Sequence, residues 1–151
     1  MFLDYDIAEK KIKAIISKST NSQVLQNVVD YLYETFEKYS WVGIYVIKEN
    51  NLLLGPWKGL QATEHTKIQI GKGICGSAAQ TGKTEIISDV SKDERYLACF
   101  VSTRSEIVVP IKKDNVIIGE IDIDSDISNA FDKHDANFLE KIADMLSKHI
   151  H

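Results

Sequence analysis

The sequence predicts an α+β fold in which one mostly antiparallel sheet carries the N-terminal and C-terminal helices on a single face. Two observations predict this class. The middle of the chain consists of β-rich segments joined by short turns, and amphipathic helical patterns occupy both ends. A chain of 151 residues has the size of one ordinary domain, so we expect residues 1–151 to form a single domain.

Two amphipathic helices are predicted at the N-terminus. Apolar residues recur at helical spacing among charged residues between about Asp4 and Ser19, which predicts the first helix. After a polar break at residues 20–22, a second apolar face begins at Val24 and continues to about Tyr39. This second pattern predicts another helix that packs on the same layer.

The central segment predicts two hairpins and two short strands. The predicted strands are residues 41–47, 52–57, 67–70, 84–87, 106–111 and 116–124. Residues 74–80 predict a short helix that Gly82 terminates. Residues 88–104 have few β signals and predict a long loop or irregular helix, a feature that is often functional in compact domains. Asp132 is expected to cap a long amphipathic helix at the C-terminus.

The composition argues against several classes of protein. The formal net charge is -4 and the lysines are scattered, so no basic patch predicts a nucleic-acid partner. The apolar runs fall short of the ~20 residues of a membrane helix, and the acidic N-terminus does not resemble a signal peptide. We therefore expect a cytoplasmic protein without a membrane partner, whose cysteines Cys75 and Cys99 start as thiols. The four histidines have no zinc-ligand spacing, so no metal site is predicted.

The pattern Gly71-x-Gly73-x-x-Gly76 formally matches a dinucleotide-binding motif. The predicted helix after it is too short for that motif, and hairpins follow rather than further βαβ units. We interpret Gly71 and Gly73 as the glycines of a tight strand-to-helix turn. Cys75 lies on this turn, where helix N–H groups would favour a thiolate or an anionic ligand. Its alternative role is that of a small buried apolar residue, which fits Cys75 better when it is taken alone.

Cys99 lies inside the predicted long loop, between Arg95 and Arg104, which are the only arginines of the chain. A cation near a thiol lowers the pKa of that thiol and raises the fraction of thiolate, the nucleophilic form. An arginine could also bind the carboxylate of a ligand. The alternative is an ordinary loop cysteine between two solvated arginines, and the local sequence does not decide between the two.

Acidic residues on a predicted central strand give a third signal. Asp122 and Asp124 point to one face of this strand, while isoleucines point to the other. Aspartate is depleted in strands, so this pair needs either solvent on an outer sheet face or a bound ligand. Trp41 and Tyr45 alternate in the same way on another strand, with a glycine between them. Aromatic residues, carboxylates and a thiol together suit a small cationic or zwitterionic ligand.

Six motifs between Trp41 and about Asp135 are similar to one known family. In chain order they are WVGIY at 41–45, LGPWKG at 54–59, GKGICGSA at 71–78, AC at 98–99, SEIVVP at 105–110 and GEIDIDS at 119–125. Their combination and order resemble the free methionine-R-sulfoxide reductases, which are GAF-domain enzymes. The resemblance implies a GAF-like fold for residues 1–151 and an oxidoreductase that reduces free L-methionine-(R)-S-oxide to L-methionine, as part of the repair of oxidative damage.

The resemblance also assigns roles to individual residues. It implies a catalytic cysteine at Cys99, a second family cysteine at Cys75, substrate-binding carboxylates at Glu106, Asp122 and Asp124, and an aromatic pocket at Trp41 and Tyr45. On this basis the Cys99 thiolate attacks the sulfoxide sulfur, while Glu106 or Asp124 stays protonated through burial and donates a proton. Cys99 would then become a sulfenic acid, which condenses with a thiol to form a disulfide.

The regeneration of Cys99 is where this chain departs from the family. The family commonly has a further cysteine before the Gly-rich turn, where residues 62–67 of this chain contain none. Cys75 is our candidate for the resolving thiol, and a partner-subunit cysteine or an external thiol are the alternatives.

The resemblance implies further partners and one alternative function. We expect no bound cofactor and an external reductant such as a thioredoxin-like protein or a small dithiol. The resemblance also implies a homodimer. The alternative function is a GAF domain that binds a small molecule as a sensor without catalysis.

Overall fold

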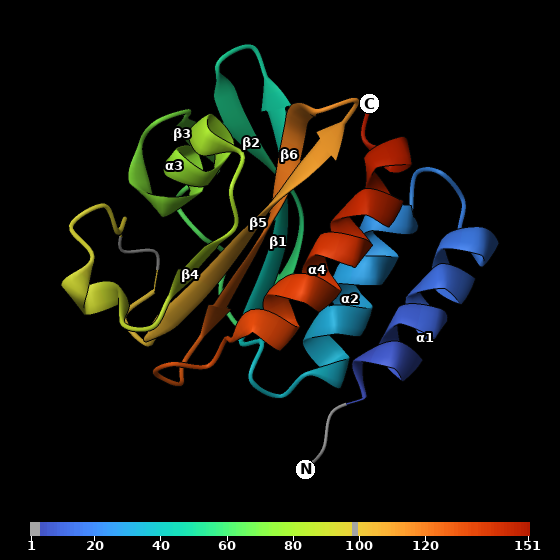
Figure 1. Cartoon of the computed structure of the whole chain (residues 1–151), viewed down its shortest axis with the longest axis horizontal. Helices are drawn as coiled ribbons and strands as arrows, with labels where there is room; N and C mark the ends of the chain where they lie inside the picture. Colours follow the sequence, from blue (N-terminus) through green and yellow to red (C-terminus); the bar gives the residue numbers. More distant parts are fainter. Residues whose placement is uncertain (1–3, 98–99) are drawn as a thin grey trace.

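The computed structural model in Figure 1 describes residues 4–97 and 100–151. The described helices and strands are α1 (Tyr5–Lys18), α2 (Val24–Thr35), β1 (Trp41–Lys48), β2 (Asn51–Gly59), β3 (Lys67–Gln69), α3 (Gly73–Thr81), β4 (Glu85–Ile87), β5 (Ser105–Lys113), β6 (Val116–Ser125) and α4 (Lys133–Leu146). Single 3-10 turns occur at Val90–Lys92 and Ser147–His149. Within the described ranges, no helix has both the length and the apolar character that a membrane span requires.

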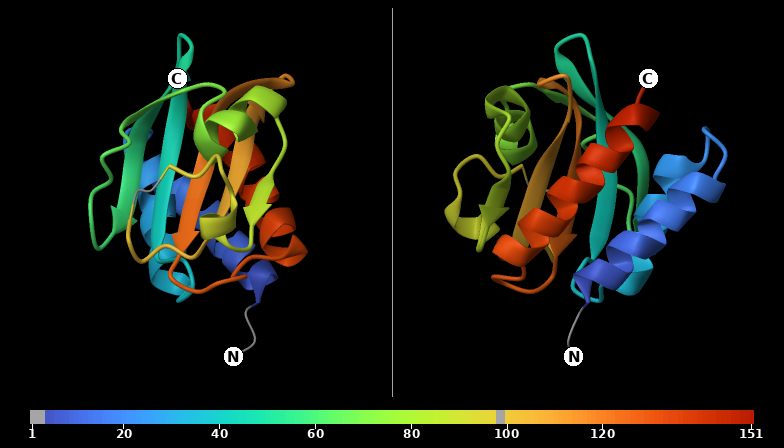
Figure 2. Two further views of the ribbon diagram at one scale, coloured as in Figure 1. Left: turned by 90° about the vertical axis from the view of Figure 1, so that its left-hand side faces the viewer. Right: turned by 45° about the vertical axis from the view of Figure 1, so that its right-hand side comes forward.

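The strands form one six-stranded sheet in the order β3-β2-β1-β6-β5-β4. Each neighbouring pair is antiparallel, and β6 lies between β1 and β5 near the centre of the sheet. Helices α1, α2 and α4 form a layer on one face, while α3 and the segment that follows β4 lie on the other face (Figures 1 and 2). This arrangement confirms the predicted α+β class with the terminal helices on one face.

Two apolar cores fill the two sides of the sheet. The larger one lies between the sheet and the terminal helices, and it includes Ile44, Ile121 and Leu139. The smaller one lies beneath α3 and includes Tyr45 and Val108. Because side chains alternate along a strand, β1 and β5 supply residues to both cores, while β6 supplies isoleucines to the larger core and acidic residues to its other face. The middle of these central strands therefore has no solvent-exposed face, and the polar side chains there are buried.

Helix α2 ends at Thr35, earlier than the predicted end near Tyr39. The ring of Tyr39 stacks on the ring of Phe36 with centroids 4.6 Å apart, and its hydroxyl donates to Asp135 at 2.8 Å. The Nζ atom of Lys38 donates to the other oxygen of Asp135 at 2.7 Å. These contacts bind the segment to α4, and residues distant in sequence supply them. Helical periodicity alone therefore overestimated the length of α2.

The ends of α3 and α4 have the predicted caps. Gly82 closes α3 in the left-handed region at φ 71°. The Asp132 carboxylate accepts hydrogen bonds from the N–H groups of His134 and Asp135, and the Asp135 side chain accepts from the Asp132 N–H in return. Tyr5 of α1 donates to the same Asp135 carboxylate at 3.1 Å, which ties the first helix to the last.

Candidate functional site

Four buried carboxyl groups lie together on the α3 side of the sheet. Strand β6 supplies Glu120, Asp122 and Asp124 at alternate positions, so all three project from the same face. Strand β5 supplies Glu106, whose Cα pairs directly with that of Asp124. Each of the four side chains is 5% exposed or less. A solvated outer sheet face therefore does not explain these acidic residues.

Strand β1 adds aromatic side chains to the same face. Trp41 pairs with Asp124, and Tyr45 lies further along the strand with the same orientation, which confirms the predicted alternation. The Trp41 indole covers Gly43 so closely that a Cβ atom there would overlap with the ring. The space above Gly43, where a side chain would otherwise lie, is thus filled by the Trp41 indole. The Tyr45 hydroxyl donates to the main-chain carbonyl of His65 at 2.7 Å, which fixes the ring.

Helix α3 places Cys75 over the carboxyl groups. The residues Gly71 (φ 95°) and Gly73 (φ 66°) turn the chain from β3 into the helix in a conformation that other residues rarely adopt, as predicted. One ligating atom from each of Cys75, Glu106 and Asp122 lies within 4.8 Å of the other two. A thiol and two carboxyl groups from three elements therefore converge at one point.

Burial raises the pKa of all four carboxyl groups. At Glu106 the rise is increased by the charges of Asp122 and Asp124, and at both Glu120 and Asp124 by the charge of Asp122. At Asp122 burial also dominates, while hydrogen bonding to Glu106 and Cys75 opposes the rise. The ion pairs among the described residues involve none of these four groups. The cluster therefore favours protonated carboxyl groups, which can donate hydrogen bonds and protons.

The thiol of Cys75 lies in an environment that disfavours the thiolate. Burial raises its pKa well above the usual value, and the charges of Asp122 and Glu120 raise it further. Of the two interpretations of Cys75, the buried position favours the small buried residue over a thiolate stabilised by helix N–H groups. Cys75 packs in the smaller apolar core with its sulfur towards the acidic side chains, rather than at an exposed helix end.

Two small cavities flank the carboxyl groups. One has a volume of about 20 Å³ and is lined in part by Cys75, Glu106 and Asp122. The other has a volume of about 50 Å³ and is lined in part by Trp41 and Asp124. The first cavity has room for about one water molecule or one bare ion. A ligand of amino-acid size requires the two cavities to widen.

The predicted nucleophile Cys99 lies outside the described residues. The nearest described residues before and after it border the two cavities, since Leu97 lines the smaller one and Phe100 the larger one. Leu97 also packs on the first turn of α3, where a Cβ atom at Gly73 would lie 2.8 Å from its side chain. The segment that leads to Cys99 therefore contacts the turn that carries Cys75.

The two arginines near Cys99 have protein partners. The Arg95 guanidinium donates to both carboxylate oxygens of Glu85, at 3.0 and 3.1 Å, and to Asp93 at 2.8 Å. Arg104 donates to the main-chain carbonyl of Val101 at 3.2 Å. The Arg95 guanidinium is thus engaged with protein carboxylates, and it holds the loop against β4 instead of being open to the carboxylate of a ligand.

The structure adds Glu120 to the candidate site, a residue that the sequence analysis omitted. Its side chain is 0% exposed, and neither of its carboxyl oxygens has a hydrogen-bond partner among the described residues. The alternation of Glu120 with Asp122 and Asp124 was a visible signal. Glutamate is rarely fully buried, however, and only the central position of β6 shows that this one is.

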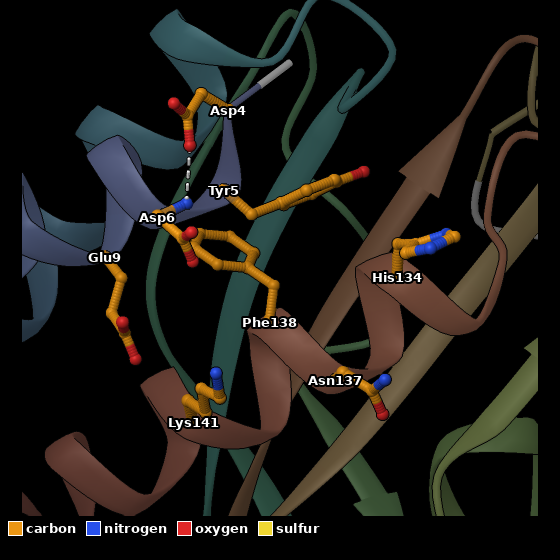
Figure 3. A pocket seen from close by; sticks show the side chains of 8 residues that line it. All are labelled: Asp4, Tyr5, Asp6, Glu9, His134, Asn137, Phe138 and Lys141. Carbon is orange, nitrogen blue, oxygen red and sulfur yellow. Dashed lines mark hydrogen bonds between the residues drawn. The ribbon is translucent and has the colours of Figure 1, made fainter. Parts of the chain in front are cut away.

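A larger hollow of about 460 Å³ lies on the opposite side of the sheet, between the start of α1 and α4 (Figure 3). Its charged lining includes Asp4, Glu9 and Lys141. The Asp4 carboxylate caps α1 by accepting from the N–H groups of Asp6 and Ile7. This open hollow has no cysteine in its lining, and its acidic groups are solvated, so the carboxyl cluster beneath α3 is the better candidate site.

Comparisons with known proteins identify the family. The GAF domain family matches residues 21–150. Protein YtsP of Bacillus subtilis is 37% identical over 148 residues, which cover 96% of this chain and 90% of that protein. The free methionine-R-sulfoxide reductase of Escherichia coli is 35% identical over 124 residues, which cover 82% of this chain and 74% of the enzyme.

A solved structure extends this likeness to three dimensions. The X-ray structure of the free methionine-R-sulfoxide reductase from Neisseria meningitidis, in complex with its substrate, superposes with a TM-score of 0.91. The two chains are 33% identical, and the match covers 99% of this chain and 92% of that one. The present chain is a GAF domain and belongs to the family of the free methionine-R-sulfoxide reductases.

Proposed function

We propose that this chain reduces free methionine-R-sulfoxide to methionine, with Cys99 as the attacking thiol. The observation that carries the proposal is the buried carboxyl cluster, which faces cavities bordered by Leu97 and Phe100, the nearest described residues before and after Cys99. The family membership supports the substrate, because the enzyme from Neisseria meningitidis has been solved in complex with its own substrate.

The first half of the reaction transfers the sulfoxide oxygen to the enzyme. The Cys99 thiolate attacks the sulfoxide sulfur, and a protonated carboxyl group at Glu106 or Asp124 hydrogen-bonds the oxygen and donates a proton to it. The S–O bond of the substrate breaks, two electrons pass to the substrate sulfur, and methionine leaves. Cys99 retains the oxygen as sulfenic acid. Burial and mutual repulsion support this role, because both raise the pKa of these two carboxyl groups.

The remaining carboxylate charge provides specificity for the free amino acid. A substrate ammonium group would neutralise part of the buried negative charge, with Asp122 at the centre of the cluster as its nearest partner. A methionine sulfoxide residue inside a polypeptide has no such ammonium group. Trp41 and Tyr45 supply an apolar wall for the methyl group and side chain.

The second half of the reaction regenerates the thiol. We propose that Cys75 attacks the sulfenic acid of Cys99, which forms a disulfide and releases water. The contact between Leu97 and Gly73 supports this pairing, since it joins the two segments that carry the cysteines. The cysteine Cα atoms must approach to roughly 7 Å. The neighbouring carboxylate of Asp122 can accept the proton of the Cys75 thiol, and an external dithiol or thioredoxin-like protein then reduces the disulfide.

A steady-state assay with a dithiol reductant tests this proposal. The wild-type protein should convert the R diastereomer of free methionine sulfoxide and leave the S diastereomer unchanged. Cys99→Ser should abolish turnover, and Cys75→Ser should slow turnover while leaving the first methionine released per chain intact. Turnover of the R form by Cys99→Ser would refute the assignment of the nucleophile. An unchanged steady-state rate in Cys75→Ser would exclude Cys75 as the resolving residue.

A further inference from the structure

The buried cluster contains a group of atoms that matches the ligand set of a metal ion. The cysteine Cys75 offers a sulfur, and Glu106 and Asp122 each offer a carboxylate oxygen, all within 4.8 Å of one another. We propose that the reduced protein binds one thiophilic divalent cation, such as Zn²⁺, through these three side chains. Binding of the ion can be measured separately from the reductase chemistry, since it needs no substrate and no turnover.

The dimensions of the group suit a tetrahedral centre. With Zn–S near ~2.3 Å and Zn–O near ~2.1 Å, neighbouring ligands of a tetrahedral ion lie roughly 3.5 Å apart. The three atoms therefore need to draw inwards by about 1 Å at most, which rotation of the side chains can supply. The cavity of about 20 Å³ bordered by Cys75, Glu106 and Asp122 lies where the ion would sit.

Buried carboxyl oxygens without a partner give an independent reason for a cation at this place. Both oxygens of Glu120 and the Oδ1 atoms of Asp122 and Asp124 are buried and accept no hydrogen bond within the described chain. Polar groups buried in this way are costly unless something pairs with them. A divalent ion would take the place of the protons on these groups and give the buried oxygens a partner, and a water molecule can complete its coordination.

The chemistry of the donors selects the class of ion. A thiolate ligand favours Zn²⁺ and its analogue Cd²⁺, whereas Mg²⁺ and Ca²⁺ prefer oxygen-only sites. Binding exchanges the thiol proton of Cys75 for a metal–sulfur bond and also displaces any proton held on Glu106 or Asp122, so at least one proton leaves for each ion bound. A cysteine held in this way cannot attack a sulfenic acid at Cys99. The bound ion would therefore inhibit recycling reversibly and occupy the place of the substrate ammonium group.

Calorimetric titration of the reduced full-length chain with ZnCl2, without sulfoxide, tests the site. We expect one ion per chain, a thermal unfolding midpoint that rises with Zn²⁺ concentration, and no binding of Mg²⁺. Titration with Cd²⁺ should produce the ultraviolet charge-transfer absorption of a cadmium–thiolate bond. The absence of saturable binding, or binding without that absorption, would overturn the proposal.

Variants locate the ion. Cys75→Ser and Asp122→Asn should each weaken Zn²⁺ binding by at least about 100-fold, because the loss of an outer-sphere partner alone costs roughly 10–100-fold. The matched controls Cys99→Ser and Glu64→Gln, of which the latter alters an exposed carboxylate, should bind like the wild type. Circular dichroism and urea unfolding establish that each variant is folded. Wild-type affinity in Cys75→Ser, or loss of binding in Cys99→Ser, would overturn the assignment.

A competition experiment separates this proposal from the proposed function. Methionine carries the ammonium group of the substrate and cannot be reduced, so it should lower the apparent affinity for Zn²⁺ if the two share the carboxyl cluster. A titration of Zn²⁺ into methionine alone corrects for chelation in solution. Unchanged affinity in the presence of methionine would refute the shared position. One-to-one Zn²⁺ binding in a protein that reduces no sulfoxide would refute the proposed function and leave the metal site standing.

Discussion

Replacing Asp122 with asparagine should make the fold more stable at alkaline pH. Asp122 lies at the centre of the buried cluster, and its charge raises the pKa of both Glu106 and Asp124. Asparagine keeps the shape of the side chain, removes the charge, and can donate its amide N–H to the Glu106 carboxylate. The substitution therefore relieves electrostatic repulsion without opening a cavity in the smaller core.

The size of the effect follows from the distance within the cluster. Carboxylate oxygens of Glu106 and Asp122 lie within 4.8 Å of each other. Two full charges at that separation repel by about 3.5 kcal/mol at an effective dielectric constant near 20. The wild type avoids part of this repulsion by holding a proton, so we expect Asp122→Asn to raise the free energy of unfolding by about 1–3 kcal/mol near pH 8.

Urea unfolding across a range of pH measures this effect. Because burial raises the carboxyl pKa values in the folded state, the folded protein binds more protons than the unfolded chain above the ordinary carboxyl pKa. The stability of the wild type should therefore be greatest at acidic pH and fall as pH rises through the raised pKa values. Asp122→Asn should show a shallower fall, and Glu64→Gln should follow the wild type. If the wild type gains stability from acidic to alkaline pH, or if Asp122→Asn is destabilised at all pH values, the assignment of buried, repelling carboxyl groups is wrong.

Three further substitutions, with Asp132→Ala as a comparison, test the scaffold around the site. Gly76→Ala places a Cβ atom 2.7 Å from the main-chain carbonyl of Gln69, so it should destabilise the fold by about 1–3 kcal/mol in urea unfolding. Asp135→Ala leaves the Tyr39 hydroxyl and the Lys38 ammonium without their shared partner, so it should lower the free energy of unfolding by about 3–5 kcal/mol. The capping variant Asp132→Ala should lower it by only about 1 kcal/mol. Equal losses in the two variants would contradict the central role of Asp135. Arg95→Ala removes partly exposed ion pairs, so it should change stability by less than about 1 kcal/mol while accelerating limited proteolysis of the loop before β5. Unchanged proteolysis would show that Arg95 does not hold the loop.

Local patterns in the sequence predicted the order of the elements and the shared face of Asp122 and Asp124, whereas the roles of Glu106 and Cys75 came from the family resemblance. The two-residue period of β6 separated Asp122 and Asp124 from the isoleucines, and the periodic apolar faces located the helices. The caps at Gly82 and Asp132 were predictable because capping depends on residues that are near in sequence. All these features depend on interactions within a few residues along the chain.

Features that depend on distant contacts were not predictable in the same way. The early end of α2 depends on the hydrogen bond between Tyr39 and Asp135, which are separated by 96 positions. The raised pKa of Cys75 depends on burial beneath α3 beside acidic side chains of β6. The pairing of Arg95 with Glu85 depends on how the loop folds back on β4. The sequence lists the charged residues, but only the packed structure shows which of them lie close enough to interact.

The most direct test of the proposed function is the yield of methionine from the pre-reduced protein in a single turnover without added reductant. The R diastereomer should yield one methionine per chain, and the intact mass should show the loss of two hydrogens that accompanies a Cys75–Cys99 disulfide. In Cys75→Ser the same yield should leave a mass increase of one oxygen, which peptide mapping places on Cys99. A full yield of methionine from Cys99→Ser, or no methionine from the wild type, would contradict the account.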